Sequence, residues 1–490
     1  MADHHQEPTV ESACRRPRSF PPLPTSNIGV TKSSNDVIDH PGATMSTTET
    51  NPAETGESTE DTTLGAAFSV RSPDQEQAED AANVPAASEL SIDEINPLNP
   101  HLFREHRWHD HFARLRAEDP VHFNELESSG RYWSITRYED VRAVDGDWKT
   151  FSSEAGITLG PPVAEMGESP VMSFIAMDPP QQTDQRNTVR GVAAPKNVRN
   201  IEPEIRKRTI ELLDSLPDGE TFDWVQTVSI ELTTALLATL FDFPWEDRSK
   251  LTRWSDIVFA IPEPGGVVES MQQKRDEMME CVHYFEGLWE QRRANPGFDL
   301  VSMLAHGEAT RDMPTHAHLG NLLLLIVGGN DTTRNTMSGS VFGLNKFPDQ
   351  YDKLIADPSL VSKMVPEIIR WVTPLSYMRR TANFDTELGG KQINKDDQIL
   401  MWYVSANRDE DMFDNADVID IERPNADRHL SFGYGIHFCM GSRLAEMQLK
   451  VLWEELLGRF ERVEVQGEAE RTFSSFVNGY THLPVKVTRK

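Results

Sequence analysis

The sequence predicts a mainly α-helical fold with a minor β region, arranged as one large domain over residues 89–490. Helical periodicity, with apolar residues three and four positions apart, dominates the chain after residue 200. Strand-like alternation is confined to short stretches. A hydrophobic content of 38% and a charged content of 26% suit a globular protein.

Residues 1–88 differ from the rest of the chain. They are rich in Ser, Thr, Glu, Asp, Ala and Pro, and Phe20 and Phe68 are their only Phe, Tyr or Trp residues. Such a segment buries too little apolar surface to offset the entropy that it would lose on ordering. We therefore expect a disordered, acidic, low-complexity tail.

The folded elements are expected in the following order. Residues 131–141, RYWSITRYEDV, begin with the alternation of a strand and pass into the start of a helix. Residues 385–404 contain a glycine pair that predicts a hairpin with a further strand, and residues 481–490 alternate as an edge strand does. The six expected long helices are Ile201–Leu216, Thr227–Phe241, Gln272–Ala294, His316–Phe347, Ser359–Val372 and Arg443–Phe460.

Charge and hydropathy exclude several functions. A formal net charge of −30 argues against binding to nucleic acid or to an anionic membrane. The longest apolar run, Leu322–Val327, has six residues, too few for a transmembrane segment, and no secretory signal is evident. The three cysteines, Cys14, Cys281 and Cys439, are too scattered for a zinc or iron–sulfur site and suit a cytoplasmic location.

The segment FGYGIHFCMG, residues 432–441, places Cys439 between a glycine-dense loop and the predicted start of a helix. Gly433 and Gly435 permit positive φ and a close approach to a flat object, and Gly441 has no side chain at the helix start. Free N–H groups and the helix dipole would stabilise a thiolate at Cys439.

A thiolate in that position suits either a nucleophile or a metal ligand. His437, two residues before Cys439, is poorly directed to act as the base of a nucleophile. A single thiolate ligand fits an iron whose other positions are supplied by a porphyrin. A buried, inert cysteine is the usual reading of one isolated thiol. The surrounding aromatic residues, glycines and histidine favour the iron ligand.

This segment, with the pattern FGxGxHxCxG, resembles the haem-binding loop of the cytochrome P-450 superfamily, and the resemblance extends over nearly the whole chain after residue 90. The resemblance implies the fold of that superfamily and a haem b cofactor. Cys439 would be the iron ligand, and the other loop residues expected to contact the haem are Phe432, Gly433, His437 and Gly441.

Residues 321–339 would form a long apolar helix except for Gly328 and Gly329, each costing about 1 kcal/mol relative to alanine. The Thr332 hydroxyl is placed to bond the Gly328 carbonyl and open the helix, which leaves a polar notch containing Asp331. The alternative, a strand turning into a nucleotide-binding helix, lacks a GxGxxG motif. The resemblance implies that Asp331 and Thr332 guide protons to bound oxygen.

Three further motifs support the resemblance. Glu367 and Arg370 are helical neighbours that would add only about 0.2–0.5 kcal/mol as a surface pair. In the superfamily such a pair joins an arginine, here Arg423, to brace the haem side. Haem propionates would be held by Arg186 and by Arg380, which keeps the expected spacing better than Arg379. A histidine that usually assists them is replaced by Gln182, which donates only a neutral hydrogen bond.

The tracts IVGGNDTTRNTMSG, TPLSYMRRTA and DTELGGKQI are similar to those of bacterial enzymes that hydroxylate terminal carbons of alkanes and fatty acids. A sister group that oxidises the side chains of sterols and branched lipids shares part of them. The expected pocket segments are residues 156–166, 254–261, 324–328, 375–378 and 477–483, in particular Leu325, Gly328, Leu375, Met378 and Tyr480.

The expected activity is that of a monooxygenase: RH + O₂ + two electrons + two protons → ROH + H₂O. Electrons would come from NAD(P)H through a separate ferredoxin and ferredoxin reductase, because little chain follows the predicted haem helix. A basic docking surface is expected at Arg186, Arg190, Lys196 and Arg443. The alternatives are a haem carrier without turnover, which would not need the Asp331–Thr332 notch, and a thiol hydrolase, which would not bind haem.

Overall fold

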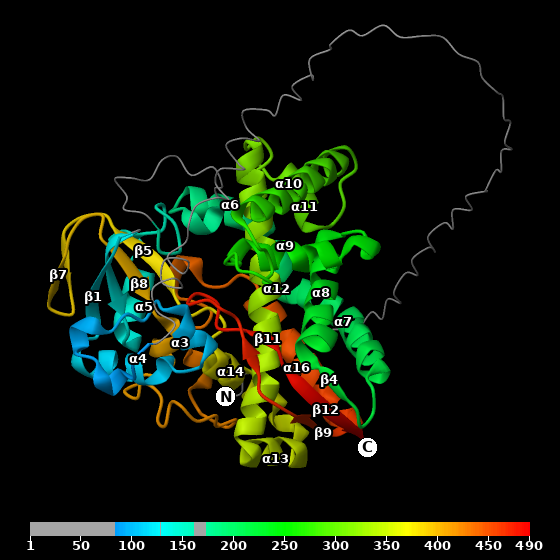
Figure 1. Cartoon of the computed structure of the whole chain (residues 1–490). Helices are drawn as coiled ribbons and strands as arrows, with labels where there is room; N and C mark the ends of the chain where they lie inside the picture. The colour runs from blue at the N-terminus through cyan, green and yellow to red at the C-terminus, as the bar shows by residue number, and fades with distance from the viewer. Residues whose placement is uncertain (1–83, 128, 161–172) are drawn as a thin grey trace, which may run out of the picture. The chain divides into compact units, whose positions relative to one another are not determined.

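Helices supply most of the framework of the computed structural model, which describes residues 84–127, 129–160 and 173–490. The longest, α12 (Thr315–Lys346), runs along the middle of these residues (Figure 1). The helices that pack directly on it include α8 (Glu231–Phe241), α9 (Ser249–Phe259), α14 (Val361–Val372) and α16 (Ser442–Arg459).

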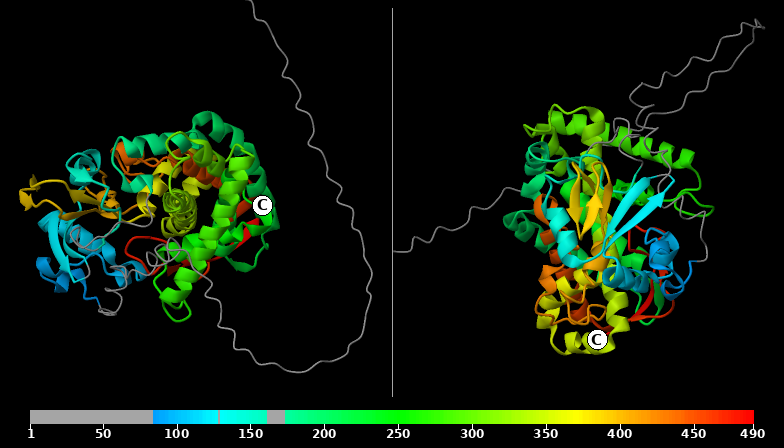
Figure 2. Two further views of the ribbon diagram at one scale, coloured as in Figure 1. Left: turned by 90° about the horizontal axis from the view of Figure 1, so that it is seen from above. Right: turned by 90° about the vertical axis from the view of Figure 1, so that its left-hand side faces the viewer.

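The other α-helices form an outer layer and link the sheets. Seen from above, α12 lies end-on with helices around it and the largest sheet to one side (Figure 2). These helices are α3 (Pro100–Arg104), α4 (Trp108–Glu118), α5 (Tyr138–Gly146), α6 (Gln181–Val189), α7 (Pro195–Ser215), α10 (Met271–Ala294), α11 (Leu300–His306), α13 (Pro348–Ala356) and α15 (Tyr403–Ala406).

The largest sheet of the described residues has the order β1-β2-β8-β5-β3 and is mixed, because β2 and β8 pair in parallel and the other neighbours are antiparallel. A second sheet has the order β4-β12-β9, and β6-β7 and β10-β11 form two-stranded ribbons. The strands are β1 (Val121–Leu126), β2 (Gly130–Ile135), β3 (Phe151–Ser152), β4 (Thr221–Asp223), β5 (Met378–Ala382), β6 (Thr386–Leu388), β7 (Lys391–Ile393), β8 (Gln398–Met401), β9 (Phe460–Val465), β10 (Glu470–Arg471), β11 (Tyr480–His482) and β12 (Pro484–Arg489).

Close packing around α12 depends on its small residues. A Cβ at Gly339 would lie 2.6 Å from Val372 of α14, and a Cβ at Gly343 would lie 2.7 Å from Ile419. Any larger side chain would push these neighbours away, because protein interiors have no spare volume of that size. The glycines therefore let α14 lie directly against α12.

The fold class predicted from the sequence is confirmed, and the helix predictions agree with α7, α8, α10, α12, α14 and α16 to within a few residues at most ends. The start of α7 is an exception, since this helix begins at Pro195 and continues through Pro203. The prediction of an edge strand at the C-terminus is wrong. Strand β12 is the middle strand of its sheet, paired with β4 on one side and β9 on the other.

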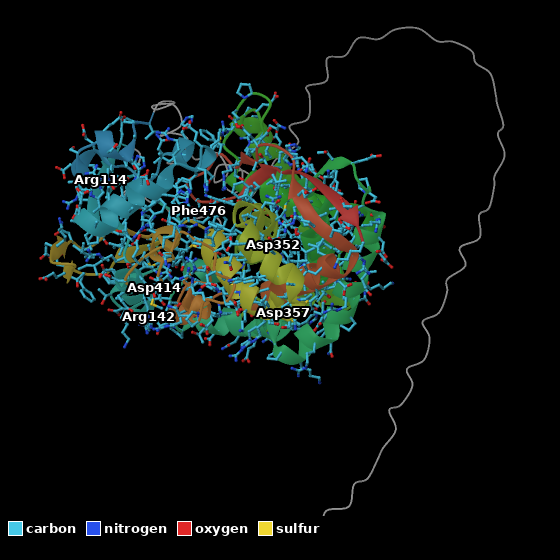
Figure 3. All side chains as sticks on the ribbon, turned by 90° about the horizontal axis from the view of Figure 1, so that it is seen from below. Arg114, Arg142, Asp352, Asp357, Asp414 and Phe476 are labelled. Atoms are coloured by element: carbon cyan, nitrogen blue, oxygen red, sulfur yellow. The ribbon has the colours of Figure 1, made fainter. Side chains whose placement is uncertain are left out.

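The boundary of the N-terminal tail also needs correction. Residues 1–83 lie outside the described residues. Ala87, which the sequence assigned to the tail, is buried in a short 3₁₀ helix over residues 87–89. Arg114, labelled at the edge of the described residues in Figure 3, donates hydrogen bonds to the carbonyls of Ala87 and Leu90. The described fold thus includes residues before 89.

Candidate functional site

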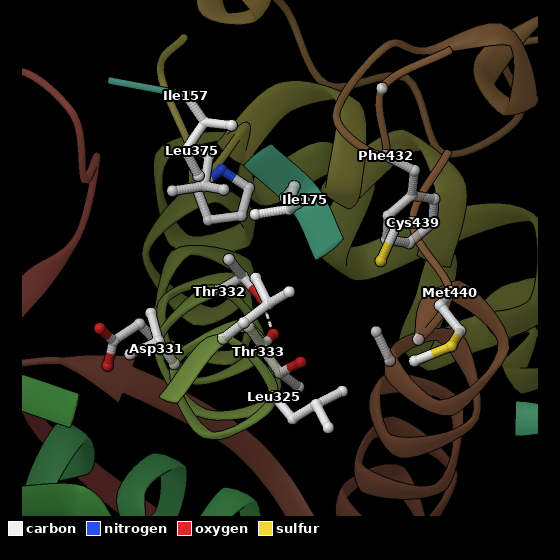
Figure 4. A pocket seen from close by; sticks show the side chains of 18 of the residues that line it. Ile157, Ile175, Leu325, Asp331, Thr332, Thr333, Leu375, Phe432, Cys439 and Met440 are labelled. Carbon is white, nitrogen blue, oxygen red and sulfur yellow. Dashed lines mark hydrogen bonds between the residues drawn. The ribbon is translucent and has the colours of Figure 1, made fainter. Parts of the chain in front are cut away.

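A cavity of about 940 Å³ lies between α12 and the loop that carries Cys439. In Figure 4 the Cys439 side chain projects from one wall, while Thr332 and Leu325 project from α12 opposite. Most of the other residues that line the cavity are apolar, supplied by α8, α12, α16 and the segment before β5. The cavity therefore combines one thiol, a hydroxyl-bearing helix and an apolar wall.

Cys439 lies two residues before Gly441, the N-cap of α16. Its own N–H donates to the Phe432 carbonyl at 2.7 Å, which closes the loop. Burial raises the pKa of the Cys439 thiol, while the backbone N–H groups of Gly441 and Ser442 and the charge of Arg186 act to lower it. The predicted placement beside a helix N-terminus is confirmed, and a bound cation would complete the stabilisation of the thiolate.

The loop approaches α5 so closely that two of its positions require glycine. Gly433 and Gly435 have φ values of +67° and +70°, in the region that L side chains rarely adopt. A Cβ at Gly435 would lie 2.8 Å from the carbonyl oxygen of Asp145. The end of α5 therefore fixes the path of the Cys439 loop.

Three basic side chains line the cavity near Cys439: Arg186, Arg380 and His437. Arg186 donates to the Phe438 carbonyl, and burial lowers the pKa of its guanidinium. Burial, together with the charges of Arg380 and Arg186, lowers the pKa of His437 to about 3. The imidazole is therefore neutral, and its Nε2 lies 3.1 Å from Ser153 Oγ in a hydrogen bond.

Asp145 is a member of this cluster that the sequence reasoning missed. Its carboxylate accepts hydrogen bonds from Arg380 Nη2 at 2.6 Å, from the Tyr403 hydroxyl at 2.8 Å and from the Tyr434 N–H at 2.7 Å. Arg380 and Asp145 are both almost fully buried. Asp145 thus orients Arg380 and anchors the Cys439 loop at the same time. No local motif marks it, because its partners are far away in the sequence.

Two further predicted cofactor contacts, Arg380 and Gln182, differ in whether they line the cavity. Of the adjacent arginines, Arg380 lines the cavity, whereas Arg379 donates to the Thr158 carbonyl and to Thr381 Oγ1. Gln182 is buried and is not among the cavity-lining residues; its amide donates to the Ile436 carbonyl at 3.0 Å. In this arrangement Gln182 supports the Cys439 loop, and its contact with the cofactor stays a prediction.

The Thr332 hydroxyl donates to the Gly328 carbonyl at 2.9 Å, as the sequence predicted (Figure 4). The helix nevertheless continues without a break from Thr315 to Lys346, so the expected opened turn is not present. A Cβ at Gly328 would meet nothing within 4 Å, whereas one at Gly329 would lie 2.7 Å from Leu237 of α8. Both glycines line the cavity, and Gly329 also lets α12 pack closely against Leu237 of α8.

Asp331 is among the residues that line the cavity, but its carboxylate is engaged by groups on the other side of α12 from Cys439. Ser255 Oγ donates to it at 3.0 Å and Arg334 pairs with it at 2.9 Å, while Arg334 also pairs with Asp256 at 2.6 Å. Figure 4 shows Asp331 on the opposite side of α12 from Cys439. Burial raises the pKa of Asp331 to about 6, and the Arg334 charge opposes that rise. Both residues line the cavity, and the Asp331 carboxylate is held in an ion pair with Arg334, whereas the Thr332 hydroxyl is bonded, among the described residues, only to its own helix.

The Glu367–Arg370 pair is fully buried, which excludes the reading as a surface pair. Two guanidinium nitrogens of Arg370 donate to the two oxygens of Glu367 at 2.8 Å, and Arg423 Nε donates to both oxygens at 3.1 Å. Arg370 also donates to the carbonyls of Asn407 and Ala416. The predicted bracing role is consistent with this network, since it ties α14 to the chain before the Cys439 loop.

Four of the five expected pocket residues line the cavity: Leu325, Gly328, Leu375 and Met378. Tyr480 is not among the lining residues, and its place in the pocket stays a prediction. Its ring packs on Phe342, and its hydroxyl accepts a hydrogen bond from Arg471 at 3.0 Å. Of the expected pocket segments, 156–166 is described only up to residue 160, and Ser474 and Phe476 line the cavity in place of residues 477–483.

The residues present fit a haem. A thiol on one wall can bind iron, and the helix opposite exposes a glycine where a flat group needs space. Two guanidinium groups and an imidazole at the same end suit the two acidic side chains of the porphyrin. We propose that Cys439 would bind the iron and that Arg186, Arg380 and His437 would bind the propionates.

Comparisons with known proteins agree with this site. The family described as "Cytochrome P450" matches residues 266–486. The chain is 36% identical to a linalool 8-monooxygenase of Pseudomonas putida over 80% of this chain and 98% of the relative. It is 32% identical to a methyl-branched lipid omega-hydroxylase of Mycobacterium tuberculosis, over 76% of this chain and 90% of the relative. The solved structure of cytochrome P450-153 from Novosphingobium aromaticivorans is 44% identical, with a TM-score of 0.74, over 81% of this chain and all of that one.

Proposed function

Because the chain belongs to the cytochrome P450 family, a family of haem b monooxygenases, we propose that its substrates are alkanes or fatty acids, hydroxylated at the terminal carbon. The observation that carries this proposal is the cavity itself. Cys439 and the Thr332 hydroxyl face the same space, and apolar side chains supply most of the remaining wall. An apolar wall of this kind favours a hydrocarbon chain over a polar substrate.

A branched lipid or a sterol side chain is the second candidate. One relative is named a methyl-branched lipid omega-hydroxylase and another a linalool 8-monooxygenase, so hydroxylation of branched hydrocarbon chains occurs among similar proteins. The two candidates share an apolar substrate and differ in its width. A cavity of about 940 Å³ has room for either class.

The protein's own residues have distinct roles in this proposal. Haem, when bound, supplies the chemistry that splits O₂ and oxidises the carbon–hydrogen bond. Thr332 holds a hydroxyl in the cavity through its bond to Gly328. Asp331 carries a proton only after leaving its ion pair with Arg334, since its carboxylate lies on the far side of α12. The apolar wall excludes water and orients the chain.

Bacterial members of the family typically receive electrons from a ferredoxin and an NAD(P)H-dependent reductase, and we propose a docking surface for that ferredoxin next to the Cys439 loop. Arg190, Lys196 and Arg443 are exposed. The side chain of Phe438, beside the cysteine, is 44% exposed. Exposed basic side chains and an exposed aromatic residue suit an acidic protein partner. The cytoplasmic location stays a prediction, and none of the described helices is long and apolar enough to cross a membrane.

Turnover with a surrogate ferredoxin and reductase tests the substrate class. Purified holoprotein would be supplied with NAD(P)H and with dodecane, dodecanoic acid, a methyl-branched fatty acid or a sterol, and the products separated by gas chromatography with mass spectrometry. We expect ω-hydroxylated products from the two linear substrates. Products only from the branched acid or the sterol would transfer the assignment to the second candidate. Absence of alcohol from all four, with haem bound, would favour a carrier.

A further inference from the structure

A single lysine lines the cavity among the described residues: Lys274, near the start of α10. Its Nζ donates to the carbonyl oxygens of Val258 and Ala260, both at 3.1 Å. These carbonyls belong to the C-terminal end of α9, which packs against α10 (Figure 1). Carbonyls at a helix end lack intrahelical partners, and the helix dipole there favours a cation. The ammonium group is thus held at the cavity wall.

Lys274 has no acidic partner among the described residues. The ion pairs of α10 that lie nearby join Arg253 with Glu277 and Lys250 with Glu280, and neither includes Lys274. Burial lowers the pKa of Lys274 to about 8, so at neutral pH most molecules still carry the charge. An ammonium group has three N–H donors. Two are used by the carbonyls, which leaves one donor for a ligand.

The other cationic groups of the cavity wall have partners or assigned roles. Arg380 is paired with Asp145, and Arg186 with the Phe438 carbonyl, both beside the Cys439 loop. Lys274 comes from a different element, in contact with α9 and α12. The cavity therefore has a second, separate positive charge in a mainly apolar wall. A hydrocarbon gains nothing from such a charge, whereas a carboxylate would.

We propose that Lys274 binds the carboxylate of a linear fatty-acid substrate and thereby leaves the methyl end for hydroxylation. This inference rests on the proposed function and makes the fatty acids the more tightly bound of its two substrate classes. A charge-assisted hydrogen bond formed out of water is stronger and more selective than one at the surface. Fixing one end of the chain also restricts which carbon reaches the reacting position, which favours the terminal one.

Lys274 also has a structural role as a cap of α9, so the test must separate that role from ligand binding. The matched ligands are dodecanoate and methyl dodecanoate, which have nearly the same shape and differ in charge. The variants are Lys274→Met, which keeps the apolar stem, and Lys274→Arg, which restores the charge. Arg275→Met serves as the control, because Arg275 neighbours Lys274 on α10 but is absent from the cavity wall.

The dissociation constants of both ligands would be measured on each holoprotein by isothermal titration calorimetry and by the haem Soret shift. In the wild type we expect dodecanoate to bind about tenfold more tightly than the ester. Lys274→Met should weaken dodecanoate binding about tenfold and leave ester binding within twofold. Lys274→Arg should recover most of the loss, and Arg275→Met should behave as the wild type does.

Two results would overturn the inference. One is equal affinity of the wild type for acid and ester. The other is an equal loss of affinity for both ligands in Lys274→Met, which would show that Lys274 only supports α9. In either case, continued ω-hydroxylation of dodecane or of the ester would leave the proposed monooxygenase function in place. The experiment therefore distinguishes a failure of the Lys274 proposal from a failure of the proposed function.

Discussion

At the scale of single residues, Cys439 combines opposing influences on its thiol. Burial disfavours the thiolate, while two backbone N–H groups and Arg186 favour it. Cys281 differs, because it is buried among apolar residues of α10 and burial raises the pKa of its thiol with no donor to offset this. The two cysteines of the described residues are therefore chemically distinct.

Cys439→Ala should abolish the far-shifted Soret band of the reduced carbon monoxide complex, because no other described thiol lines the cavity. Cys281→Ala should retain that band. The measurement is the reduced carbon monoxide difference spectrum of each purified protein. A persistent thiolate-type band in Cys439→Ala would contradict the ligand assignment.

Thr332→Ala should keep haem, carbon monoxide and substrate binding but divert electrons into hydrogen peroxide, because the hydroxyl held by the Gly328 carbonyl is lost from the cavity. The measurement is the ratio of alcohol formed to NAD(P)H oxidised. Thr332→Ser, which keeps the hydroxyl, is the control. An unchanged ratio in Thr332→Ala would show that this hydroxyl does not manage protons.

The raised pKa of Asp331 predicts that the rate of alcohol formation depends on pH. Its pKa of about 6 lies above the ordinary value of an aspartic acid, so the proton-bearing form is present below pH 6 and is lost as the pH rises through 6. Wild-type alcohol formation at saturating ferredoxin should fall across that range. Asp331→Asn should be slower at every pH and should not show this decline.

A second variant tests the cause of that shift. Asp256 shares Arg334 with Asp331, and its negative charge helps to raise the pKa of Asp331. Asp256→Asn should therefore move the decline to lower pH. The same pH profile in the wild type and in Asp331→Asn would exclude Asp331 as the titrating group.

At the scale of elements, α14 contributes to the stability of the fold through one buried charge network. One carboxylate, Glu367, is shared by Arg370 and Arg423, which also donate to backbone carbonyls before the Cys439 loop. It is the charged partner of both buried guanidinium groups. Breaking such a network leaves uncompensated charge, which costs far more than a surface ion pair contributes.

Glu367→Gln should lower the free energy of unfolding by about 3–5 kcal/mol and reduce haem content, because two arginines lose their charged partner. The matched control is Glu139→Gln, which removes the partner of Arg142. That pair also has i,i+3 spacing, but it is exposed, and Figure 3 shows Arg142 at the edge of the molecule. The control should change stability by less than about 0.5 kcal/mol. Denaturant titration followed by circular dichroism measures both, and equal effects would contradict the argument.

At the scale of the whole molecule, the N-terminal boundary is set by contacts with α4. Arg107 donates to the Val84 carbonyl, and Arg114 to those of Ala87 and Leu90. We propose that residues 1–83 are dispensable for haem binding and turnover, as expected from their composition.

A chain that starts at Val84 should match the full-length protein in haem content and in unfolding midpoint. A chain that starts at Ser91 should be less stable by about 2 kcal/mol, because the guanidinium groups of Arg107 and Arg114 lose these carbonyl partners. Haem absorbance and denaturant unfolding of both proteins check this. Loss of haem in the Val84 chain would show that the removed segment supports the fold.

The sequence by itself determined the features that depend on local spacing. A hydroxyl four residues after a carbonyl on a helix predicted the Thr332–Gly328 hydrogen bond, and i,i+3 spacing predicted the Glu367–Arg370 pair. The glycine pattern around Cys439 predicted a close turn before a helix. In these cases the backbone geometry of one element fixes which groups meet, so the order of residues is sufficient.

Only the tertiary structure decided contacts between segments that are distant in the sequence. Asp145 and Arg380 are separated by 235 positions, and no local pattern announces their pairing. The turn of the Asp331 carboxylate toward α9, the hydrogen bond from Gln182 to the Ile436 carbonyl and the central place of β12 all depend on which elements become neighbours. Lys274 lines the cavity for the same reason, because the end of α9 supplies the carbonyls that hold it. The physical cause is that charges and hydrogen-bond donors find partners that are close in space. For residues far apart in the chain, that closeness depends on how the whole core packs.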